Sequence, residues 1–253
     1  MQRTWIAVWL AACAAASPAN AADIRVYTSG APAEVQKTLA PTYATATGNH
    51  LVLTIGTLAA IVDKAAVEPF DAVVLAAPAI NTLDQKGVLL PSSRIDLARV
   101  GIGVAVRAGA PRPDLSSVEA VRKMLVEAKS IVHPDPNGGG ITGAHIARMI
   151  ERMGIADVVK PKVTYLFAVG GGVEAVAKGD AEIGLFNVSE ILPVPGAALA
   201  GVLPAELQNY ITFAGALHSG DENRDARAYL QWLTQMAARD VWTKGGFELI
   251  GGR

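Results

Sequence analysis

Cysteine is almost absent from this sequence, and neither sign of charge is in excess. A single cysteine excludes a disulfide framework within the chain and a zinc site built from several cysteines. The 22 Lys and Arg residues nearly balance the 23 Asp and Glu residues, so the chain lacks the basic excess that would neutralise a nucleic-acid backbone. Charged residues form only 18% of the sequence, too few for a disordered chain or a coiled coil. We therefore expect a folded protein with no nucleic-acid partner.

Long hydrophobic runs are also scarce, and the most continuous one stands at the N-terminus. Arg3 is the only charged residue before Asp23, and it precedes an apolar run from Trp5 to Ala16 and the small residues 19–21. This order is typical of a secretory signal, and the run is too short to span a bilayer, which takes about 20 residues. Residues 1–21 are predicted to be a signal peptide, and the mature protein is predicted to be periplasmic.

Cys13 leaves a second processing route open. Residues 10–13, Leu-Ala-Ala-Cys, resemble a bacterial lipobox, which would make Cys13 a lipidated anchor. Plain cleavage after Ala21 is preferred, because the apolar run begins very early for a lipoprotein signal. Plain cleavage would leave a mature chain without cysteine.

Short apolar runs alternate with helical patterns along the rest of the chain. The series begins with a strand at residues 24–28, a helix at 31–47 that Pro41 should kink or divide, and a strand at 51–55. About nine strands are expected, and residues 193–204, rich in Pro, Gly and Ala, are predicted to form a loop. The alternation predicts an α/β fold with mostly parallel sheets.

Two longer apolar segments, residues 97–106 and 210–217, suggest that the chain crosses twice between two lobes. The first lobe is predicted at residues 22–105 together with 211–253. The second lobe is predicted at residues 106–210.

Four predicted strand-to-helix turns place Gly, Ser or Thr at a helix N-terminus. They are Thr28-Ser29-Gly30-Ala31, Gly56-Thr57, Asn137-Gly138-Gly139-Gly140-Ile141-Thr142 and Gly170-Gly171-Gly172. Free N–H groups and the helix dipole favour negative charge there, and ligands of open α/β sheets bind at this edge. No Lys or Arg lies in the turns, so an anion would be held by N–H and hydroxyl dipoles. The alternative is that these residues only cap helices, as any single turn of this type would suggest.

Motifs for catalysis and for nucleotide binding are missing from the sequence. The glycines at 138–143 precede no Gly-Lys-Ser/Thr and lack the dinucleotide spacing, and neither Gly-x-Ser-x-Gly nor His-Glu-x-x-His is present. An enzyme would need His133 or His145 beside a carboxylate or a serine. No catalytic residue, cofactor or protein-held metal is therefore expected.

The order of these features resembles the periplasmic solute-binding proteins of ABC importers with the type II fold, and within them the molybdate-type branch. The segment Val176 to Glu190, VAKGDAEIGLFNVSE, is close to the family's V-x-x-G-E-A-D-A-G-I-V-Y-x-S-D. Other matching stretches are residues 24–31, 54–59, 70–74 and 226–247. The resemblance covers nearly the whole mature chain.

This resemblance implies two α/β lobes, each a mostly parallel sheet flanked by helices, joined by two crossover hinges that close on a ligand. It implies a binding protein rather than an enzyme, a monomer, and an ABC importer permease in the inner membrane as partner. The ligand-binding residues that it implies are Ser29, Gly30, Thr57, Gly140, Thr142, Val173 and Asn187.

Two positions depart from the family pattern. Asn187 stands where the family has a binding Tyr, and Thr57 stands where it has Ser. A small anion such as a molybdate-like oxyanion is the expected ligand. The alternatives are a small organic acid, a periplasmic sensor with the same fold, and a periplasmic enzyme.

Overall fold

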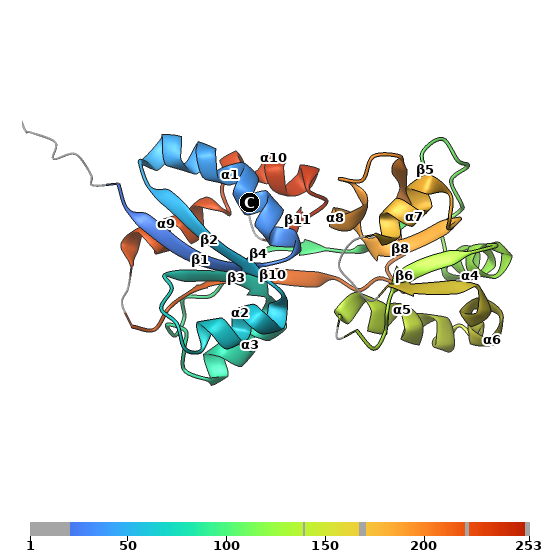
Figure 1. Cartoon of the computed structure of the whole chain (residues 1–253), viewed down its shortest axis with the longest axis horizontal. Helices are drawn as coiled ribbons and strands as arrows, with labels where there is room; N and C mark the ends of the chain where they lie inside the picture. The colour runs from blue at the N-terminus through green and yellow to red at the C-terminus, as the bar shows by residue number, and fades with distance from the viewer. Residues whose placement is uncertain (1–20, 139, 167–170, 221–222, 251–253) are drawn as a thin grey trace, which may run out of the picture.

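The computed structural model describes residues 21–138, 140–166, 171–220 and 223–250 and shows two lobes, each a β-sheet with helices on both faces (Figure 1). The predicted signal peptide, with Cys13 in it, lies outside the described residues apart from Ala21. Two lobes with flanked sheets were predicted, and the architecture confirms this fold class.

The first lobe is built on a six-stranded sheet in the order β11-β4-β10-β3-β1-β2. Its strands are β1 (Asp23–Ser29), β2 (His50–Gly56), β3 (Ala72–Ala76), β4 (Ile95–Val100), β10 (Ile211–Leu217) and β11 (Glu248–Leu249). Its helices are α1 (Ala31–Thr47), α2 (Leu58–Ala65), α3 (Ala77–Gln85), α9 (Arg224–Trp232) and α10 (Met236–Lys244). The apolar faces of α1, α9 and α10 bury one side of the sheet, and those of α2 and α3 bury the other.

The second lobe is built on a five-stranded sheet in the order β7-β6-β8-β5-β9. Its strands are β5 (Ile102–Arg107), β6 (Ile131–Pro134), β7 (Val163–Leu166), β8 (Ile183–Asn187) and β9 (Ala197–Val202). Its helices are α4 (Val118–Glu127), α5 (Ile141–Arg152), α6 (Ala156–Val159), α7 (Gly172–Lys178) and α8 (Val188–Ile191), with the short 3-10 helix η1 (Lys160–Lys162). One side of this sheet packs on α4, α5 and α6, and the other packs on α7 and α8.

Both sheets are mixed, whereas the sequence predicted mostly parallel sheets. In the first sheet β10 pairs antiparallel with β3 and β4, and in the second β5 pairs antiparallel with β8 and β9. The reason is connectivity, because β5 and β10 each begin at a crossing between the lobes. Strands β1, β2 and β3 run against β10, and β6, β7 and β8 run against β5, so their carboxyl ends face the opposite lobe.

The two crossings lie at Gly101 and at residues 203–210. Because β4 ends at Val100 and β5 begins at Ile102, the first crossing precedes the predicted boundary after residue 105. Gln208 ties the crossings together: its Oε1 accepts the Ile102 N–H at 2.7 Å and its Nε2 donates to the Ile102 carbonyl at 3.0 Å. An added Cβ at Gly101 would lie 3.0 Å from the Gln208 side chain, so glycine suits this contact.

One local prediction is wrong, and one of the two outcomes predicted for Pro41, a kink or a division of the helix, is excluded. Residues 193–204 contain β9 rather than a loop, because Ala197–Val202 pairs along β5. Pro41 does not divide the first helix, since α1 is continuous from Ala31 to Thr47. Pro41 is exposed, while Leu39 and Tyr43 on either side of it are buried against the sheet and hold both halves of the helix in place.

Candidate functional site

Ser29 and Gly30 lie where β1 ends and α1 begins, on the side of the first lobe that faces the second. Ser29 is only 6% exposed, and Gly30 is exposed with a φ of 49°, a left-handed conformation that glycine adopts without strain. No side chain caps α1 at Gly30. Pro32 has no N–H and the Ala33 N–H donates to the Gly30 carbonyl at 3.1 Å, so the first turn can offer a ligand the Ala31 N–H.

Thr57 begins α2 beside this turn. Ser29 pairs with Gly56 in the parallel register of β1 and β2, which brings the two turns next to each other. The Thr57 hydroxyl accepts the Ala60 N–H at 3.3 Å and so caps the helix. Its own O–H remains a donor, and the residue is exposed. The first lobe thus offers hydroxyls and N–H groups from two adjacent helix starts.

The second lobe offers the start of α5. Gly140 is the exposed N-cap residue of this helix, with no side-chain cap, and Thr142 is buried in its first turn. Gly143 holds the turn tightly against the end of β6. An added Cβ there would lie 2.5 Å from the Pro134 carbonyl oxygen and 2.7 Å from that of Asp135.

Val173 lies in the first turn of α7, which begins at Gly172. An added Cβ at Gly172 would lie 1.9 Å from the Leu166 side chain, so the helix start packs directly on the end of β7. Gly171, the N-cap residue, has a left-handed φ of 88°. Gly170, the first glycine of the predicted turn, lies outside the described residues.

Asn187 ends β8 and joins the second-lobe residues to one another. The Thr142 hydroxyl donates to Asn187 Oδ1 at 2.9 Å, in a buried contact. Asn187 Nδ2 donates to Glu190 Oε1 at 3.2 Å, and the Asn187 backbone N–H also bonds to this carboxyl group. Burial raises the pKa of the Glu190 carboxyl, and the hydrogen bonds from Asn187 only partly offset it. We name these three residues, Thr142, Asn187 and Glu190, the amide triad.

Glu190 was missed from the sequence as a residue of this region. Its signal is the spacing from Asn187, because an acidic residue three positions after an N-cap residue can reach back to the cap N–H. A hydrogen bond joins Thr142 and Asn187 on one lobe, and the register of β1 and β2 brings Ser29, Gly30 and Thr57 near each other on the other lobe.

Both histidines that an enzyme would need are bound to backbone carbonyl groups. The His133 ring lies 2.8 Å from the Pro134 carbonyl oxygen and packs edge-on against Tyr165, and burial lowers its pKa although Pro134 and Asp135 favour protonation. His145 Nε2 lies 2.9 Å from the Leu207 carbonyl oxygen, in the second crossing. Both contacts are structural.

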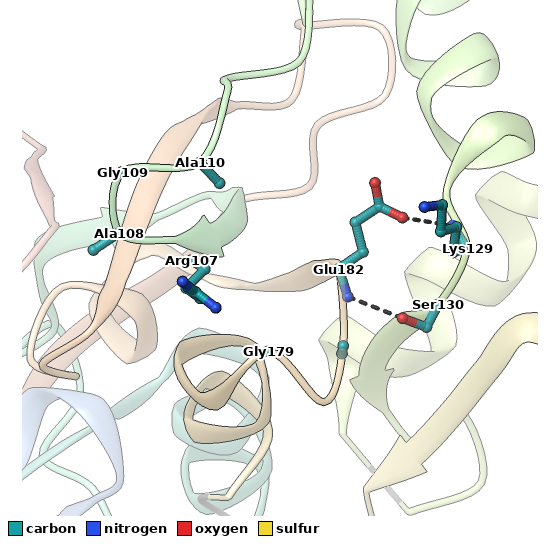
Figure 2. Close-up of a pocket in the computed structure, with 9 residues that line it drawn as sticks. Arg107, Ala108, Gly109, Ala110, Lys129, Ser130, Gly179 and Glu182 are labelled. Carbon is teal, nitrogen blue, oxygen red and sulfur yellow. Dashed lines mark hydrogen bonds between the residues drawn. The ribbon is translucent and has the colours of Figure 1, made fainter.

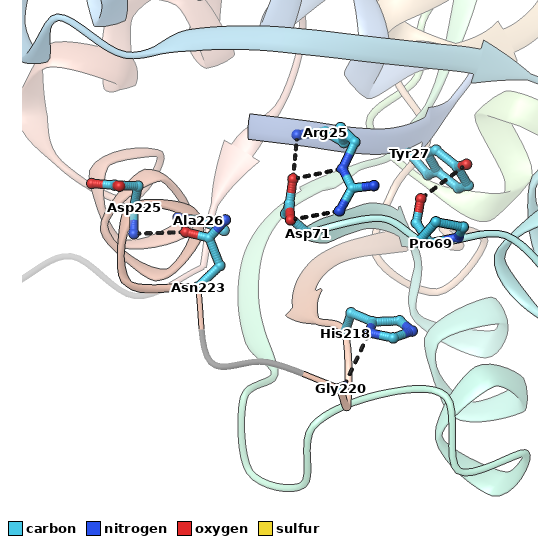
Figure 3. Close-up of polar contacts among 9 residues, drawn as sticks. All are labelled: Arg25, Tyr27, Pro69, Asp71, His218, Gly220, Asn223, Asp225 and Ala226. Carbon is cyan, nitrogen blue, oxygen red and sulfur yellow. Dashed lines mark hydrogen bonds and ion pairs between the residues drawn. The ribbon is translucent and has the colours of Figure 1, made fainter. Parts of the chain in front are cut away.

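Two groups of charged side chains lie away from the crossings, whereas the ion pair of Arg99 and Glu248 lies beside them. Figure 2 shows a cavity of about 500 Å³ beside Arg107, Lys129 and Glu182, at the end of β5 far from its crossing. Figure 3 shows Arg25 and Asp71 paired at the start of β1, also far from the crossings. Among the described residues, no group of three or more His, Cys, Asp or Glu is placed to hold a metal ion.

Comparisons with known proteins agree with the two-lobe fold. The profile of a family described as bacterial extracellular solute-binding protein matches residues 24–248. A Pseudomonas protein named aconitate isomerase is 30% identical over 235 residues, which cover 90% of this chain and 88% of that protein.

Two solved structures show the same fold at low sequence identity. The substrate-binding domain of a molybdenum ABC transporter from Clostridium difficile has a TM-score of 0.79 and 14% identity, and covers 91% of this chain and 100% of its own. The molybdate-binding periplasmic protein of Azotobacter vinelandii has a TM-score of 0.69 and 19% identity, with 90% and 100% covered. In the part of the chain that the structure describes, no helix has the length and apolar character needed to cross a membrane.

Proposed function

The chain belongs to the family of bacterial extracellular solute-binding proteins, and from this premise we propose that it captures a small anion between its two lobes. The ligand-binding residues in this proposal are Ser29, Gly30, Thr57, Gly140, Thr142, Val173 and Asn187.

One observation carries the proposal. The starts of α1 and α2 in one lobe, and of α5 in the other, carry neutral donors and follow strands whose carboxyl ends face the opposite lobe. Helix N-termini of this kind attract anions, and the turns contain no Lys or Arg. A site of neutral dipoles suits a small anion that sheds its water and is surrounded on all sides when the lobes close.

A molybdate-like oxyanion is our first candidate ligand. The Azotobacter protein of the same fold is a molybdate-binding protein, which supports this choice. Asn187, in place of the family's Tyr, leaves room for a small organic acid as the alternative. We further propose that the mature protein is a periplasmic monomer without a cofactor, and that it delivers its ligand to an ABC importer permease. The alternative is a periplasmic sensor that presents its closed form to a membrane receptor.

A thermal-shift screen tests the proposal, because a ligand that binds only the folded state raises the melting temperature. The screen compares molybdate, tungstate, sulfate, phosphate, citrate and both isomers of aconitate. A ligand at 100 times its Kd should stabilise the fold by about 2.7 kcal/mol. The control is Thr57→Asp, which keeps a helix cap but adds a negative charge and should abolish the shift. If none of the anions raises the melting temperature, the proposal is contradicted.

A second function is favoured by one observation, the relative named aconitate isomerase. We propose aconitate, a tricarboxylate, as the substrate to test for this activity. Incubation of cis-aconitate with the purified protein, followed by proton NMR, should show trans-aconitate appearing at a rate proportional to protein concentration. A thermal shift with aconitate but no conversion would leave binding as the function.

A further inference from the structure

The hydrogen bonds of the amide triad have a direction, and this direction decides what Thr142 can offer a ligand. Asn187 Oδ1 accepts the Thr142 hydroxyl proton, and Asn187 Nδ2 donates to Glu190. In this arrangement the single proton of Thr142 is already used, so its Oγ1 can only accept a hydrogen bond from a ligand. A fully deprotonated anion has no proton to give, and the arrangement therefore disfavours it.

The opposite direction needs one additional proton. If the Asn187 amide turns over, Nδ2 donates to Thr142 Oγ1 and Oδ1 faces Glu190, and the two orientations occupy the same volume. The Thr142 hydroxyl proton is then free for an anion. Oδ1 facing a carboxylate would be repulsive, so Glu190 must carry a proton and donate it to Oδ1.

We propose that Glu190 is a positioning residue that makes the site bind its anion together with one proton, which Glu190 carries. This inference rests on the proposed function, since it concerns how the same site recognises its ligand. It also states a ligand class: a fully deprotonated anion that is bound with the uptake of one proton.

The surroundings of Glu190 favour such a proton. Helix α8 packs on β5, β8 and β9, and its Val188 lies against Gly246. Strands β8 and β9 contain no ionisable side chain, and β5 contains only Arg107, at its far end. The causes of the raised pKa are burial and the opposing hydrogen bonds from Asn187, with no charged neighbour among them. Protonation is therefore governed by the triad itself.

The test is the affinity for molybdate and for trans-aconitate, measured by calorimetry from about pH 5 to about pH 9, a range that spans the raised values known for buried Glu residues. Above the pKa of Glu190 in the free protein, affinity should fall about tenfold for each pH unit, because each binding event takes up one proton. Titration in two buffers of different ionisation heat counts that proton directly.

The variant Glu190→Gln removes the titration but keeps a group that can donate or accept, so its affinity should not change with pH. The matched control is Glu174→Gln, which removes an acidic charge from the first turn of α7 and should keep the pH slope. Thr142→Ser should keep the change of affinity with pH. Thr142→Val should weaken binding and should remove the change of affinity with pH. Binding with no proton uptake, or an unchanged slope in Glu190→Gln, would overturn this inference alone. Failure of every anion to bind would overturn the proposed function with it.

Discussion

Gly143 offers a test of how closely the start of α5 is held, because a methyl group at this position has nowhere to go. The added Cβ of Gly143→Ala would lie 2.5 Å and 2.7 Å from two carbonyl oxygens at the end of β6. These are backbone atoms of the chain that leads into the site, so they cannot turn aside as a side chain would. Relief requires the first turn of α5, with Thr142 on it, to move away from β6.

The expected cost follows from two opposing terms. Overpacking of this kind lowers the free energy of unfolding by about 1–3 kcal/mol. Alanine in place of glycine inside a helix raises it by up to about 1 kcal/mol. The net loss lies between about 0 and 3 kcal/mol, and its midpoint of about 1.5 kcal/mol lowers the melting temperature by about 3–6 °C, at about 2–4 °C per kcal/mol for a chain of this length. Displacement of Thr142 should also move its hydroxyl group out of position for the ligand and weaken anion binding about tenfold.

Gly140→Ala is the matched control, three residues earlier in the same turn. Gly140 has an ordinary φ of −87°, and nothing lies within 4 Å of an added Cβ. Its melting temperature should stay closer to that of the unchanged protein than the melting temperature of Gly143→Ala does. Equal melting temperatures for the two variants, measured by calorimetry, would refute the argument that close packing fixes the start of α5.

Three further outcomes are expected. Burial opposes ionisation of Asp71, but hydrogen bonds from Arg25 outweigh it and lower its pKa. The stabilisation is therefore present above the unfolded pKa of about 4 and is lost as pH falls through the folded value, so Asp71→Asn should flatten the acid side of a melting-temperature profile. Tyr229→Phe removes the buried donor that lies 3.0 Å from Gln36 Oε1 and should cost about 1–3 kcal/mol in urea unfolding. Thr57→Asp should unfold like the unchanged protein, while its anion affinity, measured by calorimetry, falls at least about tenfold.

Helix boundaries were the easiest features to predict, because short-range chemistry decides them. Gly48, with a φ of 80°, ends α1 in the left-handed conformation that a glycine stop signal implies. Strand β9 was missed for the opposite reason. Its sequence, AALAGV, has little intrinsic strand preference, and pairing with β5 decides its conformation.

The site shows the same division between local and distant causes. The helix starts at Gly30, Thr57 and Gly140 could be predicted, because Gly, Ser and Thr in those positions have a local role. The partial burial of Glu190 could not be predicted from its neighbours in sequence. It results from where α8 packs between β5, β8 and β9, which only the assembled fold determines.

The position of β10 has a consequence for the order in which the protein folds. The second lobe is one continuous stretch, β5 to β9, whereas β10 lies between β4 and β3 in the first sheet and is synthesised after that whole stretch. Because the chain is synthesised from its N-terminus to its C-terminus, the second lobe can complete its sheet while the first lobe still lacks an interior strand. We expect the second lobe to fold first. Until residue 217 arrives, β3 and β4 have exposed edges, and this nascent half of the molecule is the part that needs protection from aggregation.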